Sequence, residues 1–439
     1  MTLPGKQRPF HFQLAANDCG PACVMALAQY YGVSTTISDL RRRLVTDPTE
    51  GTAIKQFAVG LSDLFSVQIG RQSLDHLDGT LYPFIAFWPQ QAHFVVVWSI
   101  DEQHVTFGDP GSGLQKMLIG AFFQYWDGIT IVLRPHDFSQ QRSWLEAAAS
   151  PWVMIHRFFG SVRMELVILS LPATILGLGN TLFSVFFPYY LTHLHRLFLL
   201  TAAFLVVSVI LSAVTAVYAT YLRRRLNQHL GRILEPAMDH IDTSFYTMGD
   251  AYTRFYDIQH IVDVVLGLVR DIPYTFALGI GTFGYLLYRN AAVTLFLTGL
   301  VIVLLTGLTP FMLHVRNYVY QVRLRSTHLN NALRQQWGQS SQRVLESFYS
   351  LIESTFRQTL WKIPISIVTV QTPVLGILVV AFLVGFGHSA SPHVATLLST
   401  LFLVNYFTSA AHGLYQKYVA WQVAQPSLRR LYDFVEAAE

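Results

Sequence analysis

The chain has 439 residues, of which 52% are hydrophobic and 13% are charged, and its formal net charge is +4. A chain of this length is expected to contain more than one domain. So apolar a composition excludes an ordinary soluble protein and points to a membrane protein. No basic stretch is interleaved with aromatic residues in the manner of a nucleic-acid-binding surface, so we expect no nucleic-acid partner.

The apolar residues are spread unevenly, and residues 1–135 have the pattern of a globular domain. Helices are expected at 19–31, 38–44 and 52–64, and strands at 66–69, 84–88, 93–100, 105–109 and 129–133. Helices followed by an antiparallel sheet are typical of an α+β fold. The N-terminus has no continuous apolar run, so we expect no signal peptide and a reducing, cytosolic environment for this domain.

Residues 136–164 are expected to form a linker followed by a helix. The spacing of Trp152, Ile155, Phe158 and Phe159 predicts an amphipathic helix lying along a bilayer surface. A plain linker helix fits the same pattern equally well.

Residues 165–439 are dominated by apolar runs. Six such segments follow one another, at 166–191, 197–222, 268–288, 291–313, 363–387 and 394–415. Each is long enough to cross ~30 Å of hydrocarbon, which takes ~20 helical residues. Arginine concentrates in the long connections at 223–267 and 314–362, which the positive-inside rule places in the cytosol together with both termini. We therefore predict an all-α, six-helix transmembrane domain.

The two cysteines, Cys19 and Cys23, lie about one helical turn apart, which does not suit a disulfide framework. The sequence has no second pair of ligands with suitable spacing, so we do not expect either cysteine to belong to a metal site. Cys19 begins the first helix, where the helix dipole favours an anion, and a thiolate is the form of cysteine that attacks a carbonyl. Cys23 is expected to pack in the core, and Asp18 to cap the helix.

His93 begins one predicted strand and Asp109 ends the next. A hairpin between these strands brings both side chains to the same end of the sheet, where Asp109 can orient the imidazole. Gln13 is an amide donor suited to a developing oxyanion. A buried cysteine alone is usually a small core residue, and a histidine at a strand start is usually structural. The four residues in this order favour a cysteine protease instead.

Several short stretches resemble one family, the papain-like peptidase domain of bacteriocin-processing ABC exporters. They are Gln13, Asp18-Cys19-Gly20, Ala22-Cys23, His93-Phe94-Val95 and Asp109-Pro110, within residues 8–135. The resemblance implies that Cys19 is the nucleophile, His93 the base, Asp109 its orienter and Gln13 the oxyanion donor. It also implies that the substrate is a precursor peptide with a double-glycine leader.

The membrane region resembles the six-helix domain of the same exporters. Residues 245–255 are similar to their first cytoplasmic loop, which carries a short coupling helix that docks on a nucleotide-binding domain. The resemblance implies a homodimer. A P-loop needs Gly-Lys followed by Ser or Thr, and no lysine here is followed by either. We therefore expect no cofactor and no metal in this chain, with ATP bound by a separate ATPase subunit.

Three hypotheses follow from these observations. The first is a multi-pass protein of the bacterial plasma membrane that cleaves leaders and exports the matured peptide. The second is a leader peptidase that is only anchored in the membrane and transports nothing. The third is a non-enzymatic docking domain, which the presence of both Cys19 and His93 disfavours.

Overall fold

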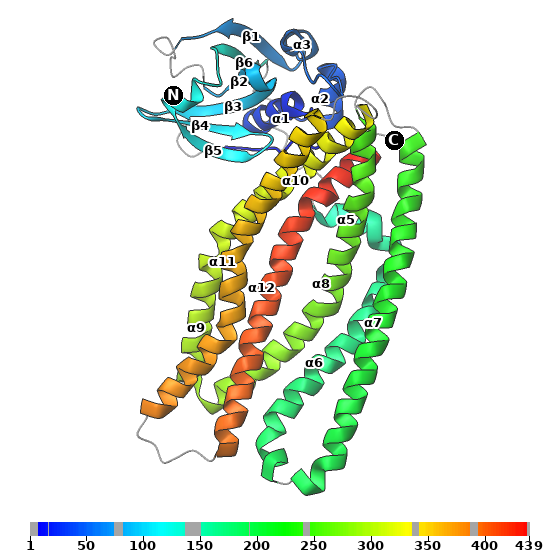
Figure 1. The fold of residues 1–439 in the computed structure, drawn as a ribbon, viewed down its shortest axis with the longest axis vertical. Coiled ribbons are helices and arrows are strands. Elements are labelled where there is room, and N and C mark those ends of the chain that lie inside the picture. The colour runs from blue at the N-terminus through cyan, green and yellow to red at the C-terminus, as the bar shows by residue number, and fades with distance from the viewer. Residues whose placement is uncertain are drawn as a thin grey trace.

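A mixed α+β domain lies at one end of an elongated helical bundle in the computed structural model of this protein (Figure 1). The structure describes residues 8–15, 17–73, 82–136, 151–192, 194–239, 246–335, 342–386 and 394–436. The predicted linker at 136–150 lies almost wholly outside these residues. The prediction of an α+β domain followed by a helical region is confirmed.

The α+β domain is built on a sheet with the strand order β1-β6-β2-β3-β4-β5, in which every pairing is antiparallel. Its strands are β1 (Phe65–Arg71), β2 (Phe84–Trp88), β3 (His93–Ile100), β4 (His104–Asp109), β5 (Gly113–Leu118) and β6 (Ile129–Pro135). Its helices are α1 (Cys19–Tyr31), α2 (Ile37–Arg43), α3 (Ile54–Gly60) and α4 (Ile119–Phe122). The sequence did not predict β5, and α3 is shorter than the predicted 52–64.

The apolar run of β3 is explained by burial of both faces of the sheet. Side chains alternate between the two faces of a strand. Phe94 and Val96 pack in one core cluster with α1, whereas Val95 and Val97 pack in another with α4. Neither face of β3 is left to solvent, so the strand has no polar alternation. This central strand positions His93 at its first residue.

The helical region consists of helices that run well beyond the apolar segments. They are α5 (Pro151–Phe159), α6 (Arg163–Thr192), α7 (Leu194–Asp239), α8 (Met248–Arg289), α9 (Ala291–Gly307), α10 (Thr309–Gln335), α11 (Gln342–Phe386) and α12 (Val394–Glu436). The predicted segment 291–313 is divided at Leu308 between α9 and α10. The long connections between apolar segments are thus largely helical in the described residues.

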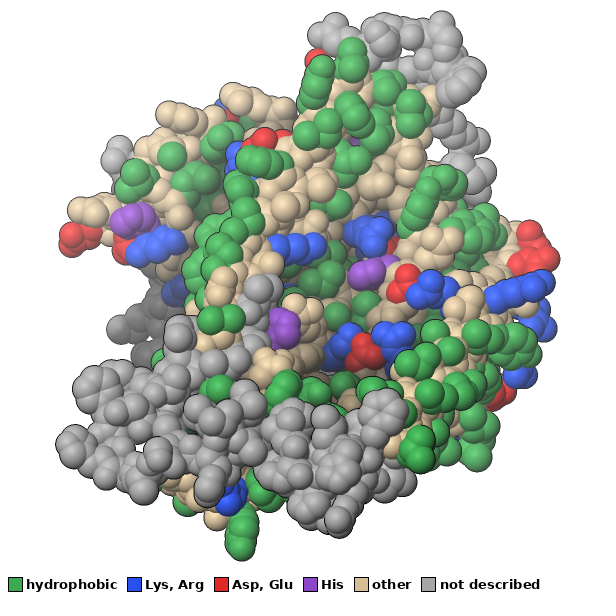
Figure 2. Space-filling view, turned by 60° about the horizontal axis from the view of Figure 1, so that its bottom comes forward, with side chains coloured by type: hydrophobic (Ala, Val, Ile, Leu, Met, Phe, Trp, Pro, Cys, Tyr) green, Lys and Arg blue, Asp and Glu red, His purple; other side chains and the backbone are tan. Residues whose placement is uncertain are grey.

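The surface of the bundle is apolar. Hydrophobic side chains cover much of the outer side of the helices, and charged and histidine side chains lie in the middle of the view and at its left and right edges (Figure 2). On α7 the exposed side chains include Leu205, Val206, Val209 and Ile210. Three stretches of the described chain are long and apolar enough to cross a membrane: Pro151–Phe186, Ala202–Asp239 and Ala291–Leu333. This arrangement is typical of a membrane protein; six passes remain a prediction.

The junction helix α5 turns its apolar face toward the bundle. Met154, Phe158 and Phe159 are buried in a cluster with residues of α12. Trp152 is 74% exposed and stacks on Trp421 with ring centroids 6.2 Å apart. A helix is therefore present where predicted, and its contact with a bilayer surface stays a prediction.

Residues 245–255 were expected to carry a short coupling helix. Phe245 lies outside the described residues, and the rest of the segment leads into and begins the long helix α8. Thr247 Oγ1 accepts a hydrogen bond from Asp250 N at 3.1 Å, and the Asp250 carboxylate accepts one from Thr247 N. This capping box starts a helix at Met248 that continues without interruption to Arg289.

Gly20, the second residue of α1, leaves no room for a side chain. A Cβ there would lie 2.8 Å from Thr52 Oγ1 and 3.3 Å from Phe57 Cζ, and both neighbours are buried. We expect Gly20→Ala to lower the free energy of unfolding of this domain by about 1–3 kcal/mol. Thermal denaturation of the full chain in detergent, followed by near-ultraviolet circular dichroism, measures this change. Gly70→Ala in β1 is the control, since nothing lies within 4 Å of its added Cβ; equal midpoints would contradict the prediction.

Candidate active site

Cys19 occupies the first turn of α1 and is 5% exposed. The expectation that the Asp18 side chain caps this helix is wrong. Asp18 stands at the N-cap position, but its carboxylate accepts hydrogen bonds from Ala15 N at 2.9 Å and Arg41 Nε at 2.8 Å. A buried guanidinium is a stronger partner for a carboxylate than a helix N–H. Burial alone would raise the pKa of Asp18, but Arg41 and the backbone N–H groups hold it below its ordinary value.

The β3–β4 hairpin brings His93 and Asp109 together. The strands pair antiparallel, with Val96 opposite Gly108, and the register shifts between Val97 and Ser99. His93 Nε2 lies 2.7 Å from Asp109 Oδ1. Asp109 is fixed in turn by Gly111 N, which donates to Oδ1 at 2.7 Å, and by the Ser112 hydroxyl, which donates to Oδ2.

The two groups form a partly buried ion pair, with side chains 18% and 14% exposed. Burial alone would lower the pKa of His93, but the charge and hydrogen bond of Asp109, together with the nearby Cys19, raise it to about 10. Burial would raise the pKa of Asp109, but His93, Ser112 and Gly111 lower it. His93 is therefore an imidazolium at neutral pH.

Cys19 also contributes to the raised pKa of His93, so its side chain lies close to the imidazole ring. Because Nε2 is engaged by Asp109, Nδ1 is the nitrogen that remains for the thiol. A protonated imidazole next to a thiol stabilises the thiolate. Cys23, one turn further into α1, is fully buried, and desolvation raises the pKa of its thiol well above the ordinary value.

Gln13 lies close to His93 and Asp109, and its backbone is hydrogen-bonded to the loop that follows Asp109. Its backbone N–H donates to Pro110 O at 3.0 Å. A Cβ on Gly111 would lie 4.0 Å from both Gln13 Oε1 and His93 Cε1. The glycine thus closely adjoins both side chains, and the hairpin end, α1 and residue 13 converge on one point.

Cys19, His93, Asp109 and Gln13 line a cavity of about 580 Å³. Its opposite wall belongs to the helical bundle and is mostly polar: Gln321, Arg325 and His328 of α10, and Glu346, Ser347 and Ser350 of α11. Sequence reasoning missed this wall, because no local pattern links residues more than 200 positions apart. It also missed Ser112, although a hydroxyl three residues after a predicted orienting carboxylate is a usable signal. Among the described residues, no group of three or more His, Cys, Asp or Glu side chains could hold a metal ion.

Comparison with known proteins finds a family match for the α+β domain. Residues 7–137 match the Peptidase C39 family. The chain is 24% identical over 315 residues to the pediocin PA-1 transport/processing ATP-binding protein PedD of Pediococcus acidilactici, covering 66% of this chain and 42% of PedD. It is 28% identical over 130 residues to the lactococcin-G-processing and transport ATP-binding protein LagD of Lactococcus lactis subsp. lactis, covering 28% of this chain and 18% of LagD.

Among solved structures, the chain matches the crystal structure of the peptidase domain of Streptococcus ComA, a bi-functional ABC transporter, with 25% sequence identity. It matches 29% of this chain and 99% of that domain, with a TM-score of 0.28. The chain spans about two fifths of the length of PedD, or 42%.

The two cysteines should differ sharply toward an alkylating reagent. Cys19 lines the cavity beside the His93 imidazolium, whereas Cys23 is inaccessible and its pKa is raised. We expect iodoacetamide at neutral pH to modify Cys19 in the folded chain and to leave Cys23 unmodified, as read by peptide mass spectrometry. Urea-unfolded chain, in which both thiols react, is the control. Modification of Cys23 first would contradict the geometry.

Asp109→Asn should remove the charge that keeps His93 protonated. Because the pKa of folded His93 lies above the ordinary 6.5, the stabilisation from the pair is present below pH 6.5 and lost as pH rises through about 10. With an ordinary pKa, only about one tenth of the rings are protonated at about pH 7.5. We expect the alkylation rate of Cys19 at that pH to fall several-fold, and Ser112→Ala, which keeps the carboxylate, to lower it less. An unchanged rate in Asp109→Asn would show that the ion pair does not activate the thiol.

Proposed function

We propose, from the Peptidase C39 family domain that residues 7–137 carry, that this chain is a membrane-bound cysteine peptidase and export subunit. It removes double-glycine leaders from bacteriocin-like precursor peptides and takes part in their translocation. The observation that carries the proposal is the convergence of Cys19, His93, Asp109 and Gln13 on one cavity. PedD and LagD, whose names describe processing and transport, support both halves of it.

The reaction is an acyl transfer. The Cys19 thiolate attacks the carbonyl carbon of the scissile peptide bond, and the side-chain amide of Gln13 donates a hydrogen bond to the oxyanion. His93 gives its proton to the leaving amine, which frees the mature peptide and leaves the leader as a thioester on Cys19. His93 then takes a proton from water, and the hydroxide attacks the thioester, which releases the leader with a free carboxyl group and restores the Cys19 thiolate beside the His93 imidazolium. Asp109 keeps the ring oriented throughout.

The polar wall of the cavity suits a substrate that offers backbone rather than side chains. Glycine residues at a cleavage site present carbonyl and N–H groups that are accessible from both sides. Side chains such as Gln321 and Ser350 can hydrogen-bond to these groups. The specificity for small residues then comes from polar contacts and lack of space, not from an apolar pocket.

Export requires parts beyond this chain. We propose a homodimer in the bacterial plasma membrane, contacting lipid through the apolar outer surface of the bundle, with the peptidase domain and both termini in the cytosol. ATP hydrolysis is assigned to a separate nucleotide-binding subunit. If a purified homodimer without such a subunit processes precursor fully but moves none into proteoliposomes, the bundle serves as an anchor only.

The full chain in nanodiscs should cleave a synthetic precursor after its Gly-Gly pair. We expect Cys19→Ala to lower the cleavage rate by about 10³-fold or more while binding of the leader, measured by fluorescence anisotropy, is retained. Cys23→Ala is the matched control and should cleave at close to the wild-type rate. Cleavage by Cys19→Ala at the normal rate would show that another nucleophile acts.

A further inference from the structure

The chain that leads into α1 has little regular structure of its own. Residues 12–15 and 17–18, here called the lead-in segment, form no described helix or strand between the N-terminus and Cys19. The segment carries Gln13 and ends at Asp18, the neighbour of Cys19. Its position must therefore be set by what it contacts. On one side that contact is the hydrogen bond from Gln13 N to Pro110 O, at 3.0 Å.

On the other side the segment is held by the helical bundle. The Phe12 ring stacks on Tyr320 of α10, with centroids 3.6 Å apart and planes 11° from parallel. Arg254 of α8 donates through Nη2 to Leu14 O at 3.3 Å. Ala15 is buried in the bundle's own core cluster. Residues on both sides of Gln13 are thus fixed by side chains of another domain.

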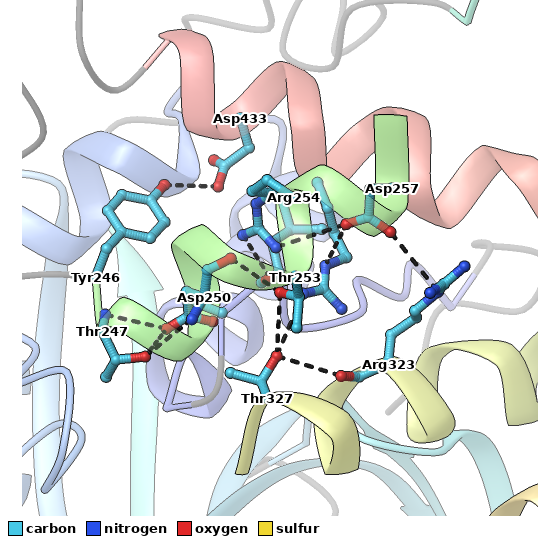
Figure 3. Close-up of polar contacts among 12 residues, drawn as sticks. Tyr246, Thr247, Asp250, Thr253, Arg254, Asp257, Arg323, Thr327 and Asp433 are labelled. Carbon is cyan, nitrogen blue, oxygen red and sulfur yellow. Dashed lines mark hydrogen bonds and ion pairs between the residues drawn. The ribbon is translucent and has the colours of Figure 1, made fainter. Parts of the chain in front are cut away.

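The far end of the segment is linked to the bundle through Arg41. This guanidinium, 1% exposed, pairs with Asp18 and donates through Nη1 to Asp433 of α12 at 3.0 Å. Tyr246 donates its hydroxyl to the same Asp433 carboxylate at 2.8 Å, and Arg41 lies over the Tyr246 ring at 4.8 Å. Figure 3 shows Tyr246 directed at Asp433, with Arg254 nearby on the first turns of α8. Asp18 is thereby held to α12 through one buried cation.

An oxyanion donor acts only when it is placed within about 0.5 Å of its productive position, and a 1 Å displacement can cost about 10²-fold in rate. The His93–Asp109 pair is built on the sheet and needs no help from the bundle. The lead-in segment belongs to no strand or helix, and its own domain holds it at Pro110 O, at Arg41 and, through Asn17 Nδ2 at 2.7 Å, at Pro48 O. Three helices, α8, α10 and α12, supply the missing constraints.

We propose that Tyr320, Arg254 and Asp433 are positioning residues for the peptidase: through Phe12, Leu14 and Arg41 they hold Gln13 in register with Cys19 and His93. This inference rests on the proposed function and adds positioning residues to it. The three contacts come from three different helices, α10, α8 and α12, so each of them can be removed separately.

The test uses the full chain in nanodiscs and the precursor peptide. We expect Tyr320→Leu and Asp433→Asn each to lower kcat by about tenfold or more, with KM within about twofold, because alignment is lost and substrate contacts are kept. Tyr320→Phe keeps the ring and should retain the wild-type kcat. Asp263→Asn, which removes an exposed carboxylate paired with Arg223 on the same bundle, is the matched control.

Two further readouts separate positioning from unfolding. Alkylation of Cys19 at about pH 7.5 should keep the wild-type rate in Tyr320→Leu, since the His93–Asp109 pair is untouched, and Cys23 should stay unmodified in every variant. Wild-type kcat in both Tyr320→Leu and Asp433→Asn overturns the inference but leaves the proposed function standing. A raised KM with normal kcat also overturns it, since these residues would then serve substrate binding. Lack of Cys19-dependent cleavage in the wild-type chain instead removes the proposed function itself.

Discussion

One buried guanidinium, that of Arg41, joins the two halves of the molecule. Taking an unpaired charge out of water costs several kcal/mol, and the cost is offset only when carboxylates and hydrogen bonds satisfy it. Asp18 of the peptidase domain and Asp433 of α12 supply those carboxylates together. Neither domain contains both, so the charge is fully satisfied only while the domains are in contact. Together with the contacts of Phe12 and Leu14, this one holds the α+β domain against the bundle, whose helices α10 and α11 form one wall of the cavity.

Local patterns were enough to predict the centre of the candidate site. The helix Cys19–Tyr31 has the predicted bounds, and Gly32 in a left-handed conformation ends it. The hairpin was predictable because two apolar strands flank a short polar turn. Strand β5 escaped notice because it is an edge strand with Leu114 and Leu118 about half exposed. Burial alternates along β5, but both leucines lie on its more exposed face, so the hydrophobic pattern of the sequence does not mark the buried face.

Contacts between distant parts of the chain could not be predicted. The Asp18 side chain departs from its expected role because Arg41, a residue of α2, reaches it from outside α1. The wall of α10 and α11 likewise arises from tertiary packing. Hydropathy located the apolar segments but not the lengths of the helices, since polar turns at the ends of α7, α8 and α12 continue the same backbone hydrogen bonding. Periodicity reports which face is buried, not what covers it.

The cavity has walls from two domains: the α+β domain supplies Cys19 and His93, and α10 and α11 supply the side that faces them. Its volume of about 580 Å³ is that of a few amino-acid residues. Under the proposed function, a target bond inside a helix has to be freed from that helix before it can lie against the Cys19 sulfur, so folding of the precursor peptide and its cleavage compete.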